Sequence, residues 1–300
     1  MSAAAPDSFR CGLVALGGRT NVGKSTLLNR LVGRKVSIVS PRPQTTRRRI
    51  LGVRHDADAQ LLLVDMPGLH LPRGLLNQQM TALARRCLSE ADVLVGVIEA
   101  GPALAAGDKA FLAEMLEYRM AKVIAINKID RVKRPSILPL AQQCAQQVAD
   151  AQIVPISALT GENLDRLVDV IKHYLPQRPA LMPEQKYTDQ SESTIAQEII
   201  REKIFFAARE EVPFSTAVKL DEFTLEPEGR LLRIAATIVV ERDSQKGILI
   251  GAGGLRLKRI GQSAREELEA LLGRRIFMTL FVKVDKNWTR DPRKVAELTA

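Results

Sequence analysis

The chain has few aromatic residues, few cysteines and no long apolar run. Only 4% of its 300 residues are Phe, Trp or Tyr, and its three cysteines, Cys11, Cys87 and Cys144, stand far apart. Their odd number and wide spacing argue against a disulfide framework and against a zinc site. No segment approaches the roughly 18 apolar residues of a membrane-spanning helix, and "MSAAAPDSFR" has no apolar targeting core. We therefore expect a cytoplasmic protein without a transmembrane segment.

The positive charge of the chain is concentrated in two stretches. The formal net charge is +10, and residues 34–54 carry seven Lys and Arg but no Asp or Glu. Residues 242–294 carry 13 basic residues against 6 acidic ones, directly after an acidic stretch at 181–241. Clustered positive charge favours a polyanionic partner, but a solvated surface explains it equally well. Charge alone leaves both interpretations open.

Apolar runs of strand length alternate with helix-length segments in the first 175 residues. Strands that are buried on both faces have such continuous apolar runs, and the helices between them cover the two faces of the sheet. The pattern predicts a doubly wound α/β domain. The expected strands are "CGLVALG", "AQLLLVD", "ADVLVGVIEA", "AKVIAIN" and "AQIVPIS", and the expected helices are Lys24–Gly33, Gly74–Ser89, Gly107–Arg119, Ser136–Ala149 and Glu162–Tyr174.

A second, α+β domain is expected after the segment "LPQRPALMPE", because three prolines in ten residues are typical of a linker. The order of elements beyond it is α-β-β-α-α-β. The expected elements are a helix from Thr194 to Glu211, strands at Phe214–Leu225 and Leu231–Arg242, helices on both sides of "GAGG", and a strand at Arg275–Val284. The predicted organisation is a tail at 1–9, the first domain at 10–175, a linker at 176–193 and the second domain at 194–300.

The turn between the first strand and the first helix reads "GGRTNVGKSTLLN". From Gly18 to Ser25 it matches the P-loop pattern Gly-x4-Gly-Lys-Ser, at the strand-to-helix position that a P-loop requires. Glycines let backbone N–H groups point at phosphate oxygens, Lys24 reaches the outer phosphates, and Ser25 offers a hydroxyl to Mg²⁺. The four fixed positions match by chance in roughly one per cent of chains this long. The predicted nucleotide contacts in this loop are Gly18, Arg19, Thr20, Asn21, Val22, Gly23, Lys24, Ser25 and Thr26.

Three later turns, each after a predicted strand, complete a site for a guanine nucleotide. In "NKID", the carboxylate of Asp130 can accept from both the ring N1–H and the exocyclic amine of guanine, a pair of donors that adenine lacks. In "DMPG", Asp65 can hold Mg²⁺ through water, and the N–H of Gly68 can meet the γ-phosphate. Because the carboxyl ends of the strands share one edge of the sheet, these turns are expected to meet. The predicted contacts are Asp65, Gly68, Asn127, Lys128 and Asp130, with Ser157, Ala158 and Leu159 of "SAL" packing against the base.

The motifs "GRTNVGKST", "PQTTRRRI", "DMPGLH", "NKID" and "SALTG" resemble those of the translation-factor class of small GTPases. In the second domain, Gly251-x-x-Gly254 stands between two helices in the order α-β-β-α-α-β, which resembles a type II KH domain. Together with "VKVDKNW", nearly the whole chain is similar to the Era family of bacterial GTPases. Thr20 and Glu99 stand where that family commonly has proline and aspartate, and neither position has an assigned role.

The resemblance implies a GTPase that binds the small ribosomal subunit and the 3′ end of its rRNA, and that couples late 30S maturation to the GTP cycle. In a KH fold, the GxxG loop brings backbone close to RNA phosphates. With few aromatic residues, recognition is expected to use backbone contacts and base-edge hydrogen bonds more than stacking. Peripheral association with the inner face of the plasma membrane is a further expectation. The predicted RNA contacts are Gly251, Ala252, Gly253, Gly254, Arg256, Lys258 and Arg259, although a solvated helix face also explains the cations.

Hydrolysis of GTP is expected to depend on positioning and charge neutralisation, with Lys24, Asn21, Thr46 and Gly68 as the catalytic candidates. Thr46, or Thr45 beside it, is expected to close the switch loop onto Mg²⁺ and the γ-phosphate, so the predicted metal contacts are Ser25, Thr46 and Asp65. The residue after "DMPG" is Leu69, where Ras-type proteins have a glutamine that orients the attacking water. Slow intrinsic hydrolysis is therefore expected.

Additional positive charge near the phosphates can come from two sources. Arg47–Arg49 are candidates for an arginine finger. Alternatively, GTPases that resemble this chain can hold K⁺ through an asparagine at the position of Asn21, with backbone carbonyls of the switch loop. Asn21 can equally well satisfy the backbone of its own loop, so both roles stay open.

Other classes of function remain open from the sequence. A P-loop ATPase or metabolite kinase uses the same loop, although "NKID" favours guanine. An RNA-binding module with a vestigial GTPase needs only residues 194–290, whereas intact Lys24, Ser25 and Asp65 favour an enzyme. A GTPase that acts on another structured RNA is a further alternative.

Overall fold

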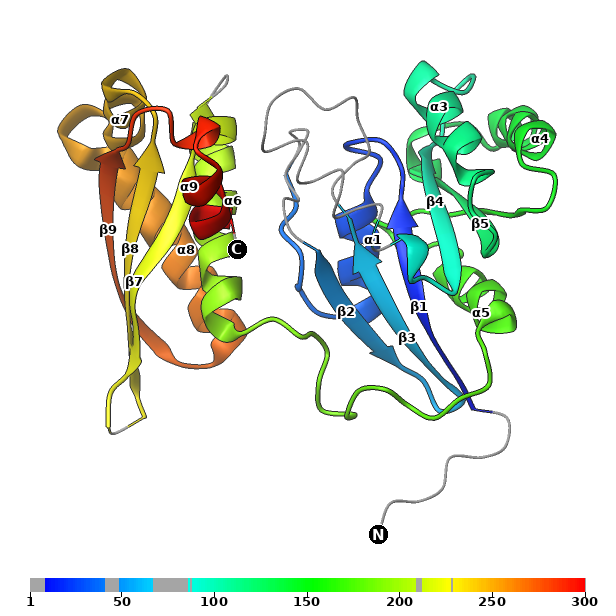
Figure 1. Ribbon diagram of the computed structural model, residues 1–300, viewed down its shortest axis with the longest axis horizontal. Helices are drawn as coiled ribbons and strands as arrows, with labels where there is room; N and C mark the ends of the chain where they lie inside the picture. The colour runs from blue at the N-terminus through cyan, green and yellow to red at the C-terminus, as the bar shows by residue number, and fades with distance from the viewer. Residues whose placement is uncertain are drawn as a thin grey trace, which may run out of the picture. The chain divides into compact units, whose positions relative to one another are not determined.

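The computed structural model describes residues 9–40, 49–66, 86, 88–208, 212–227 and 229–299. These residues form two compact units, with the division between Asp189 and Gln190 (Figure 1). No helix in the described part of the chain is long and apolar enough to cross a membrane. Each unit has its own hydrophobic core.

In unit 1, the described residues build a mixed sheet with the strand order β2-β3-β1-β4-β5-β6 (Figure 1). All neighbouring strands are parallel except β2 and β3. The strands are β1 (Arg10–Gly17), β2 (Ile50–His55), β3 (Ala59–Asp65), β4 (Val93–Glu99), β5 (Ala121–Asn127) and β6 (Gln152–Pro155), and the helices are α1 (Lys24–Val32), α3 (Ala106–Met115), α4 (Ile137–Gln147) and α5 (Leu164–Tyr174). The predicted α/β class is confirmed.

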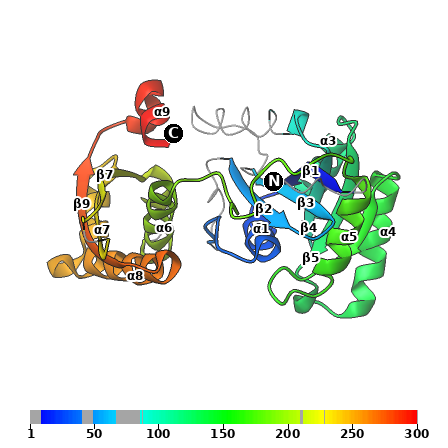
Figure 2. The same cartoon turned by 90° about the horizontal axis from the view of Figure 1, so that it is seen from below.

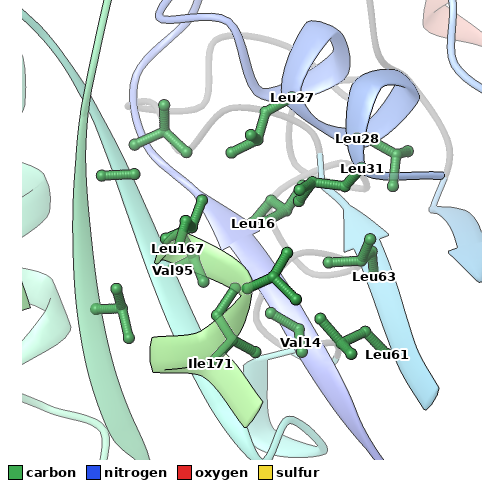
Figure 3. Close-up of a cluster of buried hydrophobic side chains, with 14 of the residues drawn as sticks. Val14, Leu16, Leu27, Leu28, Leu31, Leu61, Leu63, Val95, Leu167 and Ile171 are labelled. Atoms are coloured by element: carbon green, nitrogen blue, oxygen red, sulfur yellow. The ribbon is translucent and has the colours of Figure 1, made fainter. Parts of the chain in front are cut away.

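Helices cover both faces of this sheet because the strands bury alternate residues on opposite sides. On one face, Val14 and Leu16 of β1 meet Leu27 and Leu31 of α1, and α5 joins the same cluster through residues such as Ile171 (Figure 3). On the other face, β1 and β3 contribute the intervening residues, and α3 and α4 complete that cluster. Side chains with a period of two in the strands and about 3.6 in the helices thus fit together.

The sequence did not predict strand β2, which lies at the edge of the sheet and runs antiparallel to β3. A glycine weakens a strand pattern, and Gly52 stands inside this one. Tertiary packing requires glycine at this position, because a Cβ there would lie 2.6 Å from Val32 and 2.8 Å from Leu28 of α1. The predicted helix Gly74–Ser89 lies mostly outside the described residues, so it stays a prediction.

The proline-rich segment after α5 lies against unit 1 rather than apart from it. The side chain of Gln60 in β3 is buried, and its Oε1 accepts from the backbone N–H groups of Leu181 (2.8 Å) and Met182 (2.9 Å). Further along, the N–H of Val53 donates to the carbonyl of Tyr187, and the hydroxyl of Thr188 donates to the carbonyl of Leu51. The segment therefore extends the sheet edge beyond β2.

Unit 2 is a smaller α+β arrangement with the strand order β7-β8-β9, in which β7 and β8 are antiparallel and β8 and β9 parallel. Helices α6 and α8 pack side by side on one face of the sheet (Figure 2). Its elements in chain order are α6 (Glu192–Ala207), β7 (Ala217–Leu225), β8 (Leu231–Val240), α7 (Asp243–Ile250), α8 (Leu255–Leu272), β9 (Arg275–Val284) and α9 (Pro292–Thr299). The first six follow the predicted order.

Helix α9 and the turn before it, which the sequence did not predict, cover part of the opposite face of this sheet. Trp288 is fully buried there with Val295 of α9 and with Ala217 and Val239 of the sheet. The indole N–H of Trp288 donates to the carbonyl of Ser215 at 3.0 Å. The two faces of the sheet therefore have separate apolar clusters.

Candidate functional site

The predicted nucleotide motifs of unit 1 lie where parallel strands end. Strands β1, β3, β5 and β6 run in the same direction, and the four motifs begin directly after, or at, their carboxyl ends. The structure therefore brings the motif residues that it describes to one edge of the sheet, as expected for an open α/β sheet.

The two glycines of the P-loop have backbone conformations and surroundings that exclude a side chain. Gly18 has φ +136° and Gly23 has φ +102°, both unfavourable for other residues. A Cβ on Gly18 would collide with the carbonyl oxygen of Val97, and a Cβ on Gly23 would collide with the side-chain nitrogen of Asn127. The loop thus passes close to both β4 and the end of β5.

Lys24 opens helix α1, and its ammonium group lies inside the loop. Its Nζ donates to the carbonyl oxygens of Gly18 (3.0 Å) and Arg19 (2.9 Å). Burial lowers the pKa of Lys24, although the nearby carboxylate of Asp65 opposes that shift. A buried cation that is ringed by loop carbonyls fits an anionic ligand, which would favour its charged form.

Oxygen atoms that could bind a metal ion lie close together at Ser25, Ser37 and Asp65. The hydroxyl of Ser25 donates to Asp65 Oδ2 at 2.5 Å, and the hydroxyl of Ser37 donates to the same oxygen at 3.0 Å. Asp65 and Ser37 are buried. A carboxylate with hydroxyls beside a phosphate-binding loop is the donor set that suits Mg²⁺, so the residues fit the predicted metal.

Asn127 joins the P-loop to the two turns that are predicted to read the base. Its side-chain Nδ2 donates to the carbonyl of Val22 at 2.7 Å, and its Oδ1 accepts from the N–H of Ala158 at 2.9 Å. The hydroxyl of Ser157 donates to Asp130 Oδ1 at 2.6 Å. The hydrogen bond from Ser157 therefore orients the exposed carboxylate of Asp130. Leu159 is 71% exposed and is open to a ligand.

A cavity of about 360 Å³ lies beside these turns. Thr26, Ala158 and Leu159, which the sequence predicts as nucleotide contacts, line one part of it. Arg30, Arg34 and Lys35, which belong to none of the predicted nucleotide motifs, line another part. This cavity beside the predicted nucleotide contacts therefore carries three cationic side chains that the motifs do not include.

In unit 2, the GxxG segment connects α7 to α8 and exposes its backbone. Gly251, Gly253 and Gly254 have φ values of +70°, +56° and +77°. A Cβ on Gly253 or Gly254 would meet nothing within 4 Å, so their backbone conformation, and not crowding, requires glycine.

A groove of about 490 Å³ runs from the GxxG segment between α8 and β9. Gly254, Lys258, Gly261 and Arg265 line one wall at helical spacing, and residues 276–280 of β9 line the other. Of the predicted RNA contacts, Gly254 and Lys258 face this groove, whereas Arg256 donates to the carbonyl of Ile248 in α7. The sequence did not indicate Gly261 or Arg265.

Comparison with known proteins gives matches to both units and to the whole chain. Residues 13–128 match the family described as 50S ribosome-binding GTPase, and residues 211–289 match the KH domain family. GTPase Era of Syntrophus aciditrophicus is 43% identical over 96% of this chain and 94% of its own length, and that of Heliobacterium modesticaldum is 44% identical over 95% of each. The chain belongs to the Era family of GTPases.

Solved structures of the Era family agree in fold. A crystal structure of Era in complex with MgGDPNP and nucleotides 1506–1542 of 16S ribosomal RNA has a TM-score of 0.93 at 41% identity, covering 97% of this chain and 98% of that one. An Aquifex aeolicus Era variant bound to GDP and AlF4⁻ has a TM-score of 0.92 at 41% identity, covering 97% and 99%. The family resemblance and the GTPase activity expected from the sequence are confirmed.

Several predicted residues lie outside the described part of the chain. These are Thr46 with its alternative Thr45, Gly68, Leu69, and the arginines Arg47 and Arg48. Their roles, and the individual contacts predicted for the other site residues, stay predictions. The sequence missed Ser37 and Glu99, because their hydrogen bonds and ion pairs reach residues that are distant in the chain.

Proposed function

We propose that this chain binds and hydrolyses GTP in unit 1, binds the 3′ end of 16S rRNA in unit 2, and assists maturation of the 30S subunit. The observation that supports it most strongly is the arrangement around Asn127, whose side chain links Val22 of the P-loop to Ala158, next to the Ser157 hydroxyl that donates to Asp130. The Era structure with MgGDPNP and 16S rRNA nucleotides supports the same pairing of ligands.

Phosphate binding is assigned to the P-loop and to Lys24. Backbone N–H groups at the start of α1 face the phosphates, and the buried ammonium of Lys24 neutralises their outer oxygens. Ser25 and Asp65 would hold Mg²⁺, Asp65 through water, and the ion would neutralise charge that develops between the β- and γ-phosphates. Thr46 and Gly68 complete the set assigned to the γ-phosphate.

Guanine specificity is assigned to Asp130. Its carboxylate accepts the ring N1–H and the exocyclic amine of guanine, while Ser157 fixes one of its oxygens at 2.6 Å. Adenine presents no such pair of donors, and it would leave a carboxylate that is turned toward the base without partners. The exposed side chain of Leu159 packs on the base.

Hydrolysis is slow in this proposal, because Leu69 cannot orient water as glutamine does in Ras-type proteins. We assign K⁺ to the Asn21 position as the additional positive charge beside the phosphates. Asn21 has a left-handed backbone conformation with φ +62°, and its carbonyl accepts from Lys128 Nζ at 2.7 Å. The residue is thereby fixed at the edge of the P-loop.

RNA binding is assigned to the groove between α8 and β9. Strand β9 pairs only with β8, so its other edge carries backbone donors and acceptors that no described strand uses. Consecutive residues of β9 line the groove, which places that edge where bases can hydrogen-bond to it. The GxxG segment and Lys258 bind the RNA phosphates at the end of the same groove.

The predicted organisation into a GTPase domain at 10–175, a linker at 176–193 and a KH domain at 194–300 is part of the proposal. A protein that acts on ribosomal subunits works in the cytoplasm, and we place this chain there. Peripheral attachment to the membrane stays a prediction.

The nucleotide assignment is tested by Asp130→Asn. The variant should weaken GTP binding by about 100-fold, because two hydrogen bonds to a charged acceptor are lost. It should also admit xanthosine triphosphate, whose carbonyl replaces the amine of guanine. Equilibrium titration of both nucleotides measures this, with Asp169→Asn on the exposed face of α5 as the matched control. Unchanged preference for GTP in the Asp130 variant would exclude Asp130 as the base reader.

A further inference from the structure

Strand β4 ends at Glu99, whose carboxylate lies between the two motifs that are assigned to opposite ends of the nucleotide. Glu99 Oε2 pairs with Arg19 Nη2 of the P-loop at 2.8 Å, and Glu99 Oε1 pairs with Lys128 Nζ of the guanine motif at 2.9 Å. Arg131, which follows that motif, lies 3.9 Å from Oε1. Each oxygen of one carboxylate thus holds a different loop.

The Arg19 side of this contact is fixed independently of the ligand. Arg19 Nε donates to Asp108 Oδ1 at 3.0 Å, and Asp108 is buried at the start of α3. The guanidinium is therefore occupied by two carboxylates, which indicates that the side chain of Arg19 anchors the P-loop rather than meeting phosphate. Its carbonyl, in turn, accepts from Lys24 Nζ.

The side chain of Lys128 is also held by two contacts. Lys128 has a left-handed backbone conformation, with φ +68°, and its ammonium group divides between Glu99 and the carbonyl of Asn21 in the P-loop. The ammonium group of Lys128 is therefore held between the end of β4 and the P-loop. Loss of the Glu99 contact would leave only a neutral acceptor for this cation.

The charge of Glu99 is maintained by the same contacts. Burial acts to raise the pKa of Glu99, but Lys128 and Arg19 outweigh it, so the pKa lies below its ordinary value. The side chain is 27% exposed, which means that solvent weakens each pair without removing it. At neutral pH the carboxylate of Glu99 is therefore ionised and pairs with both Arg19 and Lys128.

We propose that Glu99 is a positioning residue for nucleotide binding: its carboxylate fixes the P-loop and the guanine-reading turn relative to each other. The spacing between the phosphate and base sites is then set before the nucleotide arrives, which lowers the cost of ordering the two loops on binding. Glu99 does not need to touch the ligand. This inference rests on the proposed guanine-nucleotide site.

The test measures GDP affinity of the full chain by isothermal titration, since GDP avoids hydrolysis during the measurement. Glu99→Gln keeps the shape of the side chain but removes its charge, and it should weaken GDP binding about tenfold, the scale that two partly solvated ion pairs can supply. Glu99→Asp retains the charge on a shorter side chain and should recover part of the loss. Thermal unfolding without nucleotide reports whether each variant is folded.

A double-mutant cycle separates positioning from general support of the fold. If Glu99 acts through Lys128, the loss caused by Glu99→Gln should shrink to about twofold in a Lys128→Met background. Asp108→Asn is the matched control, because it removes a carboxylate from Arg19 and leaves Lys128 paired with Glu99. It should cost less than Glu99→Gln.

Three outcomes would contradict a positioning role for Glu99. These are an unchanged affinity in Glu99→Gln, an additive cycle with Lys128→Met, and equal losses in the Glu99 and Asp108 variants. Failure of the unsubstituted chain to bind GDP would instead contradict the proposed nucleotide site. The two failures are therefore distinguishable in one series of titrations.

Discussion

Glycines serve different purposes in the two units, and the difference reflects the ligands that are proposed for them. In the P-loop, a Cβ on Gly18 or Gly23 would collide with neighbouring backbone or side-chain atoms. In the GxxG segment, a Cβ on Gly253 or Gly254 would project into open space. Unit 1 thus encloses a compact anion with tightly packed loops, whereas unit 2 presents backbone at a surface over which a chain can lie.

Charged side chains show the same contrast. Lys24 is buried and touches two carbonyl groups of its own loop, and Arg19 is held by two carboxylates. In unit 2, Lys258 and Arg259 are exposed on α8. A site built from interlocking contacts should respond sharply to small changes, whereas an open groove should respond mainly to a change of charge.

The largest effect is expected from charge reversal in the GxxG segment. Replacing both Ala252 and Gly253 with aspartate places two negative charges where RNA phosphates approach most closely, so affinity for a 16S rRNA 3′-end oligonucleotide should fall by more than about 100-fold. Replacing both with asparagine is the matched control, since asparagine has the same size and tolerates φ > 0. Filter binding measures the affinity for RNA. A GDP titration measures the nucleotide affinity of unit 1, which should be unchanged. Retained RNA binding in the aspartate variant would place the RNA surface elsewhere.

A pair of single substitutions compares the glycines directly. Gly23→Ala combines an unfavourable φ with a collision at Asn127, so GDP affinity should fall by about 100-fold. Gly254→Ala has an unfavourable φ of +77° but open space, so RNA affinity should fall by about tenfold at most. Titration of each variant with its own ligand gives both numbers. Equal losses would show that crowding does not distinguish the two sites.

The K⁺ assignment predicts an effect on rate in unit 1. GTP hydrolysis should be about tenfold faster in K⁺ than in Na⁺ at matched ionic strength, because a weakly hydrated cation can neutralise charge beside the phosphates. Asn21→Ala should remove the difference while GDP binding persists. Phosphate release is the measurement. Equal rates in the two salts for the unsubstituted chain would leave Asn21 with a structural role.

The smallest effect is expected from an ion-pair cluster in unit 1, where Lys172 of α5 pairs with Asp56 (2.8 Å) and Asp58 (2.7 Å). Burial acts to raise the pKa of Asp56, but Lys172 and Arg54 outweigh it. The hydrogen bond from Lys172 lowers the pKa of Asp58. Both folded-state values lie below 3.8, so the stabilisation is present above that pH and is lost as pH falls through the lowered values.

Lys172→Met should therefore reduce the free energy of unfolding at neutral pH, and the difference from the unsubstituted chain should shrink in acid. Urea unfolding at neutral pH and below pH 3.8 measures it. A difference that does not change with pH would indicate lost packing of the lysine stem and not lost charge pairing.

The sequence predicted those parts of the fold whose pattern is local. Strands β1 and β3 to β6 have continuous apolar runs, and β9 begins and ends at the predicted residues. Strand β2 and helix α9 were missed, because Gly52 is explained only by the packing of α1, and Trp288 and Val295 only by a distant sheet face. Periodicity within a segment cannot report a partner that lies far along the chain.

The candidate site divides along the same line. The P-loop and "NKID" were predictable, because each function requires a fixed spacing within one turn. The link that Asn127 makes between Val22 and Ala158 was not predictable in detail, nor was the bridging position of Glu99. These contacts join residues from three or more strand ends, and only the folded sheet brings them together.

The contact between Gln60 and the proline-rich segment bears on how unit 1 can be produced by itself. A chain cut after Tyr174, at the end of α5, would leave the buried amide of Gln60 facing water or an apolar gap, and it would expose the edge of β2. An uncovered strand edge invites pairing between molecules. In an expression fragment that extends through Asp189, the proline-rich segment still covers the edge of β2. We expect the fragment that ends at Tyr174 to precipitate.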